Sequence, residues 1–273
     1  LALLAAMAGA AIGAGAALGG WPGLALGAAL LLGLPALARR RLLLDVMLAD
    51  WRFAVDIARG RSPAYAARIQ RFAEEIRDAM TRPGVEEVVL VGHSLGAVFA
   101  VQALAEALRR DPRLLARPEG PRLRLIGLGS SVLKIALHPA AAELRADLAA
   151  LALTPGLDWT DYASRRDALS FERAEAVATL SLPGRGARLE SIHPRDMLDA
   201  GGWRRIAWQP LRIHRQYVMG NRRRYFLDFA LLCCGPLPAG WRADRVLGAD
   251  GALGTTAMPA APAAAPAPEE RAA

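Results

Sequence analysis

Five consecutive residues, Gly92-His93-Ser94-Leu95-Gly96, follow an apolar, β-branched run and lead directly into a helical pattern. A serine hydroxyl attacks a carbonyl carbon only when it stands clear of its neighbours and within reach of a base. A tight turn between a strand and a helix presents it in this way. We expect Gly92 and Gly96 to flank the turn because a Cβ would crowd the backbone there. The pattern predicts that Ser94 is a nucleophile, and a turn serine without chemistry is the alternative.

A helix is expected directly after the turn, from Leu95 to about Arg109, because small and apolar residues recur there at helical spacing. The first N–H groups of a helix carry partial positive charge and have no partner within the helix. The backbone amide of Leu95 is therefore the predicted donor to the oxyanion that forms when a carbonyl carbon is attacked.

The expected strand, turn and helix resemble the nucleophile elbow of the α/β-hydrolase fold, in particular its lipase-like and esterase-like members, over roughly residues 85–236. The resemblance implies a mainly parallel sheet and a triad in the chain order serine, acid, histidine. A full fold of this kind has several strands before the elbow, whereas only residues 42–80 are available here. Three alternatives follow: a shortened fold, a second oxyanion donor from residues 54–61, or a donor supplied by sequence upstream of Leu1.

Residues 159–171 are similar to the strand and acid loop of lipase-like hydrolases, including the DDHD-type phospholipase domain. In those proteins an Asp-Pro-Val stretch follows the strand and ends near an aromatic residue. Asp167 and the four residues up to Phe171 fill that place here, without the proline. The resemblance therefore implies Asp167 as the acid, and Asp161, in the middle of the expected strand, is the alternative.

The chain has four histidines from which the base can come. His214 opens an apparent helix late in the chain, as the resemblance requires, so we predict that it takes the proton of the nucleophile. His193 is the alternative, although its Ser-Ile-His-Pro context favours a surface position. His93 lies inside the elbow and is expected to point elsewhere, and His138 precedes the acid loop.

The beginning of the chain is strongly apolar. Residues 1–38 contain no charged side chain, and Arg39, Arg40 and Arg41 follow at once. A Gly-Gly-Trp-Pro-Gly break divides the tract into residues 1–18 and 21–38, each just long enough to span a bilayer as a helix. This pattern predicts a transmembrane hairpin over residues 1–41. A signal peptide, a buried hairpin and one long tilted helix are the alternatives.

The net charge of +8 comes almost entirely from arginine, in clusters at 39–41, 204–205 and 222–224. The first cluster resists translocation, so we expect a membrane of the bacterial inner-membrane type with the following domain in the cytoplasm. Anionic lipid headgroups are the predicted partner of these arginines. A nucleic-acid partner is not expected, because no recognised binding motif accompanies the charge.

The rest of the chain divides by composition. An amphipathic connector and a helix are expected over 42–84, and an α/β catalytic domain over 85–248, with strands near 85–91, 122–128 and 157–163. We also expect a helix at 134–153, a covering excursion at 171–202, a helix at 225–234 and a disordered Ala/Pro-rich tail at 249–273. Cys233 and Cys234 have no zinc-ligand spacing, so no metal or other cofactor is predicted.

These residues together predict a membrane-anchored serine hydrolase that cleaves a carboxylic ester through an acyl-enzyme intermediate. A lipid or acyl ester is the expected substrate, and this rests on the predicted anchor and on the resemblance to lipases. Two alternatives remain: a catalytically silent domain of the same fold that acts as a membrane interaction module, and acyl transfer to an acceptor other than water.

Overall fold

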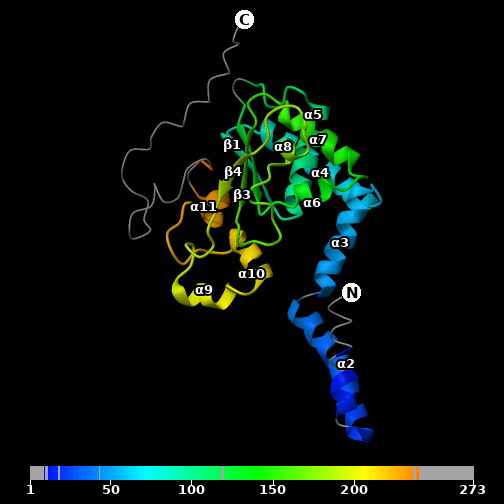
Figure 1. The fold of residues 1–273 in the computed structure, drawn as a ribbon. Coiled ribbons are helices and arrows are strands. Elements are labelled where there is room, and N and C mark those ends of the chain that lie inside the picture. The colour runs from blue at the N-terminus through cyan, green and yellow to red at the C-terminus, as the bar shows by residue number, and fades with distance from the viewer. Residues whose placement is uncertain are drawn as a thin grey trace, which may run out of the picture. The chain divides into compact units, whose positions relative to one another are not determined.

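The computed structural model describes residues 9, 12–17, 19–42, 44–117, 120–235, 238 and 239. The predicted tail at 249–273 lies outside them. The chain forms two compact units, residues 1–56 and 57–273, and Figure 1 shows their elements.

The first unit consists of helices. Residues 12–17 are helical, and α2 (Gly20–Leu42) and α3 (Leu44–Ala58) follow. The chain turns at Gly19 and Gly20, whose φ angles of 62° and 57° suit glycine. An ideal Cβ on Gly15 would lie 2.8 Å from the carbonyl oxygen of Gly23, so the segments on either side of this turn approach backbone to backbone.

The predicted transmembrane hairpin is not supported by the structure. Among the described residues, no helix combines the length and the apolar character that crossing a membrane requires.

The second unit is a mixed α/β domain, as the sequence predicts. Its elements in chain order are α4 (Pro63–Thr81), β1 (Glu87–His93), α5 (Gly96–Arg110), β2 (Arg122–Leu128), α6 (Val132–Ala136), α7 (Ala142–Ala152), β3 (Asp158–Ala163), α8 (Ala176–Thr179), β4 (Arg188–Ser191), α9 (Ala200–Ile206), α10 (Pro210–Arg215), the 3₁₀ helix η1 (Gln216–Val218) and α11 (Phe229–Cys234).

The four strands form one parallel sheet in the order β1-β2-β3-β4. Each crossover moves in the same direction along the sheet, and crossovers of this kind are right-handed. Their helices must therefore cover the same face, and Figure 1 shows α5 to α8 together with α4 on one side of the sheet. The carboxyl ends of all four strands meet at one edge, where loops can hold a site.

The other face of the sheet is covered by the chain that follows β4. Leu128 from the sheet, Ile192 after β4, and Met197 and Tyr217 beyond it are completely buried in one apolar cluster. Figure 1 shows α11 on this side of the sheet, and α9 and α10 beyond the ends of the strands. The cluster fixes the segment that carries His214 against the strand ends.

Two segments differ from the sequence-based expectation. The helix predicted over 134–153 is two helices, α6 and α7, because the chain turns through Pro139. Within the predicted excursion 171–202, residues Arg188–Ser191 form β4, the fourth strand. This strand has four residues, and all of them are exposed or half-buried, so it carries no apolar alternation by which the sequence could reveal it.

Candidate active site

Ser94 lies in the turn between β1 and α5 with a φ of 56°, a left-handed conformation that is rare for a residue with a side chain. Its N–H donates to the carbonyl of Leu128 at 3.0 Å, and its own carbonyl accepts from the N–H of Ser131 at 3.1 Å. An ideal Cβ on Gly92 would lie 2.4 Å from the Cα of Ala97, so a glycine is required there. The turn is therefore held in its strained form from both sides.

Gly96 differs from the expectation drawn for it. An ideal Cβ there would meet nothing within 4 Å, and its φ is not positive. The crowding that the motif suggests at both glycines applies to Gly92 alone.

Asp167 and His214 form a buried pair. Asp167 follows β3, His214 lies in α10, and the Nδ1 of His214 is 2.8 Å from the Oδ2 of Asp167. Only 3% of Asp167 and 5% of His214 are exposed. Burial alone would raise the pKa of the Asp167 carboxyl, but its hydrogen bond to His214 and the charge of that residue lower the pKa instead. The carboxylate is therefore ionised and fixes the proton of the imidazole on Nδ1.

The second nitrogen of His214 has no partner. Nε2 is buried and makes no hydrogen bond within the described chain, whereas the hydroxyl of Ser94 lies 3.3 Å from the hydroxyl of Ser131. A neutral imidazole with its proton on Nδ1 presents a free lone pair at Nε2. Among the described residues, Nε2 of His214 is thus left able to accept a proton. Rotation of the Ser94 side chain would turn its hydroxyl away from that of Ser131.

Gly129 packs against the buried pair from the end of β2. Its φ is 54°, and an ideal Cβ would lie 3.1 Å from Cε1 of His214 and 3.2 Å from Oδ2 of Asp167. Its N–H donates to the carbonyl of Tyr162 on β3 at 2.8 Å. A glycine between the strand ends therefore allows the acid and the histidine to approach them closely.

His93, which the sequence places in the elbow, also contacts His214, and this contact was not predicted. The prediction that it points elsewhere is wrong: its ring centroid lies 4.7 Å from that of His214, and its Nε2 lies 2.9 Å from the carbonyl oxygen of His214. A carbonyl only accepts, so Nε2 of His93 carries a proton. Burial lowers the pKa of His93, and the hydrogen bond to the carbonyl of His214 offsets part of this shift. The alternation of side chains along a strand was the signal that could have indicated this contact, because it sets the face of the sheet on which the residue before Ser94 lies.

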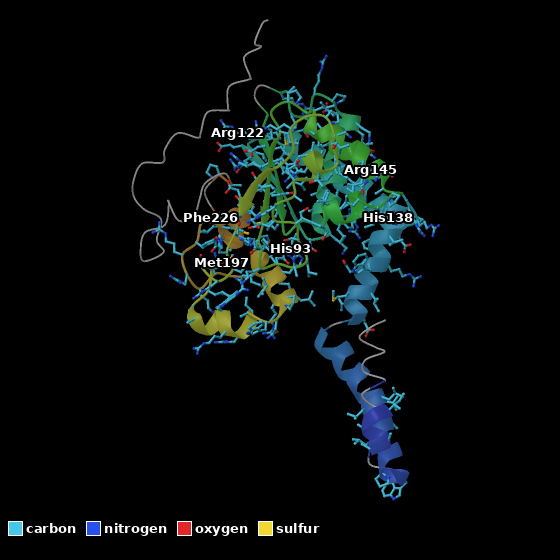
Figure 2. The ribbon with its side chains drawn as sticks, viewed as in Figure 1. His93, Arg122, His138, Arg145, Met197 and Phe226 are labelled. Carbon is cyan, nitrogen blue, oxygen red and sulfur yellow. The ribbon has the colours of Figure 1, made fainter. Side chains whose placement is uncertain are left out.

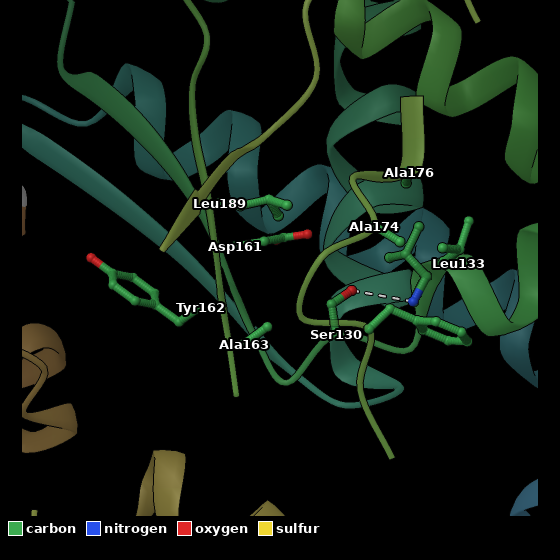
Figure 3. Close-up of a pocket in the computed structure, with 10 residues that line it drawn as sticks. Ser130, Leu133, Asp161, Tyr162, Ala163, Ala174, Ala176 and Leu189 are labelled. Atoms are coloured by element: carbon green, nitrogen blue, oxygen red, sulfur yellow. Dashed lines mark hydrogen bonds between the residues drawn. The ribbon is translucent and has the colours of Figure 1, made fainter. Parts of the chain in front are cut away.

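The alternative acid, Asp161, lies elsewhere. It is in the middle of β3, level with Gly127 and Leu189 on the neighbouring strands, and its Oδ1 accepts from Nε1 of Trp159 at 3.3 Å. Figure 3 shows its carboxyl group directed into a small pocket that Ser130 and Leu189 also line. The pocket has a volume of about 20 Å³, room for about one water molecule.

The two other histidines contribute nothing to the buried pair. His193 is exposed, and its backbone N–H donates to the hydroxyl of Tyr225. His138 accepts from the N–H of Ala140 through its Nδ1, and Figure 2 shows it well away from His93.

The amide of Leu95 is available as a donor. Within the described chain its N–H makes no hydrogen bond, and it lies directly before α5. No strand precedes β1 among the residues that the structure describes, so a second donor from a loop after an earlier strand is not among them. The described residues also contain no cluster of His, Cys, Asp or Glu that could hold a metal ion.

Comparison of this chain with protein-family models, with curated proteins and with solved structures finds no match. Its function must therefore be inferred from the chemistry of the site.

Proposed function

We propose that the protein is a serine hydrolase of carboxylic esters, built as a shortened α/β-hydrolase, with Ser94 as nucleophile, His214 as base and Asp167 as the acid that orients it. The observation that carries the proposal is the buried bond of 2.8 Å between Asp167 and His214, with Nε2 of the histidine left unpartnered. The backbone of Ser94 at the end of β1 supports it, because hydrogen bonds to Leu128 and Ser131 hold the turn in its left-handed conformation at the carboxyl end of the strand.

In the first half of the reaction, Nε2 of His214 removes the proton of the Ser94 hydroxyl as its oxygen attacks the ester carbonyl. The imidazolium that forms is stabilised by Asp167, which keeps its negative charge throughout. The N–H of Leu95 donates to the developing oxyanion. His214 then returns the proton to the departing alcohol, and an acyl group remains on Ser94.

In the second half, water attacks the acyl group, His214 takes one proton of that water, and the carboxylic acid leaves as Ser94 recovers its hydrogen. No cofactor enters either half. Acyl transfer uses the same residues with an alcohol or amine in place of water, so the site geometry serves both reactions.

We further propose an acyl or lipid ester as the substrate and a location at the membrane. The apolar sequence at the start of the chain and the arginine clusters support this part of the proposal.

The test compares two serines that share one backbone conformation. Ser181 is exposed and has a φ of 52°, close to the 56° of Ser94, so its replacement by alanine is a matched control for changes in backbone strain. We expect Ser94→Ala to abolish turnover of p-nitrophenyl butyrate, and Ser181→Ala to retain it. Equal turnover in both variants would overturn the proposal and favour a silent membrane interaction module.

A further inference from the structure

The segment that carries His214 has an unusual charge composition. Residues 200–227 include no aspartate or glutamate, yet they include seven arginines: Arg204, Arg205, Arg212, Arg215, Arg222, Arg223 and Arg224. The segment covers α9, α10 and η1 and the chain that follows them. We call it the basic segment.

Several of these arginines form no ion pair within the described part of the chain. Some arginines elsewhere in the domain pair with carboxylates, as Arg109 does with Asp147 and Arg124 with Glu87, whereas others have no ion pair among the described residues. In the basic segment, Arg222 lies 3.4 Å from a carboxylate oxygen of Asp199. Four further members are exposed and have no ion-pair partner within the described part of the chain: Arg205, Arg212, Arg215 and Arg223. What distinguishes the basic segment is that seven arginines occur in it with no acidic residue between them, so its net positive charge can attract an external anion.

A tryptophan stands at the exposed turn of the same segment. Trp208 lies between α9 and α10, and 93% of it is exposed. The neighbouring aromatic side chains pack within the domain: the ring of Trp203 lies 5.5 Å from the guanidinium carbon of Arg166, and Tyr217 is completely buried. An indole exposed to this extent is unfavourable in water, but it is a preferred side chain at the boundary between lipid headgroups and acyl chains.

We propose that the α9–α10 part of the basic segment docks on an anionic lipid bilayer, with Trp208 among the headgroups and the surrounding arginines on lipid phosphates. The occupant follows from charge complementarity and from the exposed indole of Trp208. The docking itself is independent of catalysis. Its consequence rests on the proposed function: because α10 holds His214, docking would bring the proposed ester-cleaving site to the surface from which a lipid ester is drawn.

A bilayer fits this surface better than single-stranded nucleic acid. Proteins that bind single strands stack successive bases on several exposed aromatic rings. Here Trp208 alone among the aromatic residues of the basic segment is exposed, since Tyr225 and Phe226 pack on each other with ring centroids 4.5 Å apart. One ring surrounded by arginines matches a lipid headgroup layer, in which no repeated stacking is needed.

The experiment measures contact between Trp208 and lipid in the full chain. Vesicles of brominated phosphatidylcholine, with or without phosphatidylglycerol, quench indole fluorescence on contact. The signal of Trp208 is the difference between the parent and Trp208→Phe, and Trp203→Phe is the matched control. This difference removes the contribution of the other tryptophans, including those in the apolar first unit. We expect a quenched Trp208 signal with phosphatidylglycerol and little or none without it.

A pair of arginine variants tests the charges. Arg205→Gln/Arg212→Gln changes the proposed surface, whereas Arg82→Gln/Arg113→Gln removes two exposed arginines that precede β1 and β2, at the opposite edge of the sheet. We expect the first pair to raise the vesicle concentration for half-maximal Trp208 quenching by roughly tenfold or more. The control pair should leave it within about twofold. Equal effects of the two pairs, or equal quenching by neutral and anionic vesicles, would overturn the proposal.

The same quenching in the Ser94→Ala chain separates this inference from the proposed function. Retained quenching without ester turnover supports docking even if the site is not a hydrolase. Turnover without Trp208 quenching rejects docking and leaves the hydrolase standing. Quenching abolished by an oligonucleotide at concentrations below those of the lipid would assign the surface to nucleic acid and also reject the proposal.

Discussion

Two aspartates, Asp161 in β3 and Asp167 in the loop after it, have pKa values that shift in opposite directions, although Asp161 is half-buried and Asp167 is buried. Burial and the charge of Glu175 raise the pKa of Asp161 to about 6, and the hydrogen bond from Trp159 offsets only part of this rise. Burial also acts on Asp167, but the contact with His214 outweighs it and lowers the pKa. The partner of each carboxyl group, and not burial alone, therefore decides the direction of its pKa shift.

The position of each residue relative to the strand explains the difference in partner. Asp161 is in register with Gly127 and Leu189, so its neighbours come from the middle of the sheet. Asp167 lies beyond the end of β3, where the chain after β4 can reach it with the side chain of His214. Parallel strands gather such loops at one edge, and only residues past the strand ends can meet there.

The largest expected effect contrasts the two aspartates in catalysis. Asp167→Asn should reduce turnover of an ordinary ester by roughly 10⁴-fold, because an amide favours the wrong tautomer of His214 and cannot stabilise the imidazolium. Asp161→Asn should leave turnover within about twofold, since Asp161 has no bond to that histidine. Steady-state kinetics on both variants test this. With a p-nitrophenyl ester, Asp167→Asn should lose less turnover, because nitrophenolate departs with little need for protonation by the imidazolium. A larger loss for Asp161→Asn would reverse the assignment of the acid.

The second prediction concerns stability against pH. Asp161 has a pKa of about 6 in the fold and an ordinary value of 3.8, so its ionisation opposes folding increasingly as the pH rises from 3.8 to about 6. Asp161→Asn should therefore gain roughly 3 kcal/mol in free energy of unfolding over the parent between pH 4 and pH 8. Asp167, with its lowered pKa, stabilises the fold above its ordinary value and loses this contribution as the pH falls, so its variant should show the opposite slope. Denaturant titrations at several pH values measure both, and a flat difference for Asp161→Asn would contradict the account.

A third prediction compares the glycines beside the two aspartates. A Cβ on Gly129 would press on Tyr217 at 2.8 Å and on His214 at 3.1 Å, whereas a Cβ on Gly127 would meet the carboxyl of Asp161. Gly129→Ala should lower turnover by roughly tenfold or more, because it displaces the catalytic pair. Gly127→Ala should lower the melting temperature with turnover per folded molecule nearly unchanged, because it moves only Asp161. Equal kinetic losses in both variants would show that the two regions are not separate.

The smallest effect is expected at His193. It is exposed and remote from the buried pair, so His193→Ala should change turnover by less than about twofold, in contrast to the near-complete loss for His214→Ala. Parallel assays of the two variants decide the identity of the base, and an inactive His193→Ala beside an active His214→Ala would contradict the present assignment.

The sequence predicted those parts of the domain in which local patterns are strong. The apolar, β-branched run before Ser94 predicted β1. The helix expected within residues 42–84 is α4, and the side chain of Ser62 caps its start by accepting from the N–H of Tyr65. The strand β4 was missed because its four residues have no buried member, and its place in the sheet depends on pairing with β3.

The site was predictable in part. The spacing of the motif singled out Ser94, and chain order suggested Asp167 and His214, two residues 47 positions apart whose contact only the folded chain establishes. The role of His93 could not be predicted, because it depends on a carbonyl 121 positions later in the chain. The apolar start of the chain predicted membrane spans, yet among the described residues no helix meets that description.

The most direct test of the central claim is the site of covalent labelling by a fluorophosphonate probe, mapped by peptide mass spectrometry on the parent and on His214→Ala. The account predicts a phosphonyl adduct on Ser94 in the parent, because the deprotonated serine displaces the fluoride and remains bound to phosphorus. The adduct should form at least roughly 10³-fold more slowly in His214→Ala, since the base that activates the serine is gone. An adduct on another residue, or equal labelling rates in the two proteins, would contradict the claim that Ser94 and His214 act together.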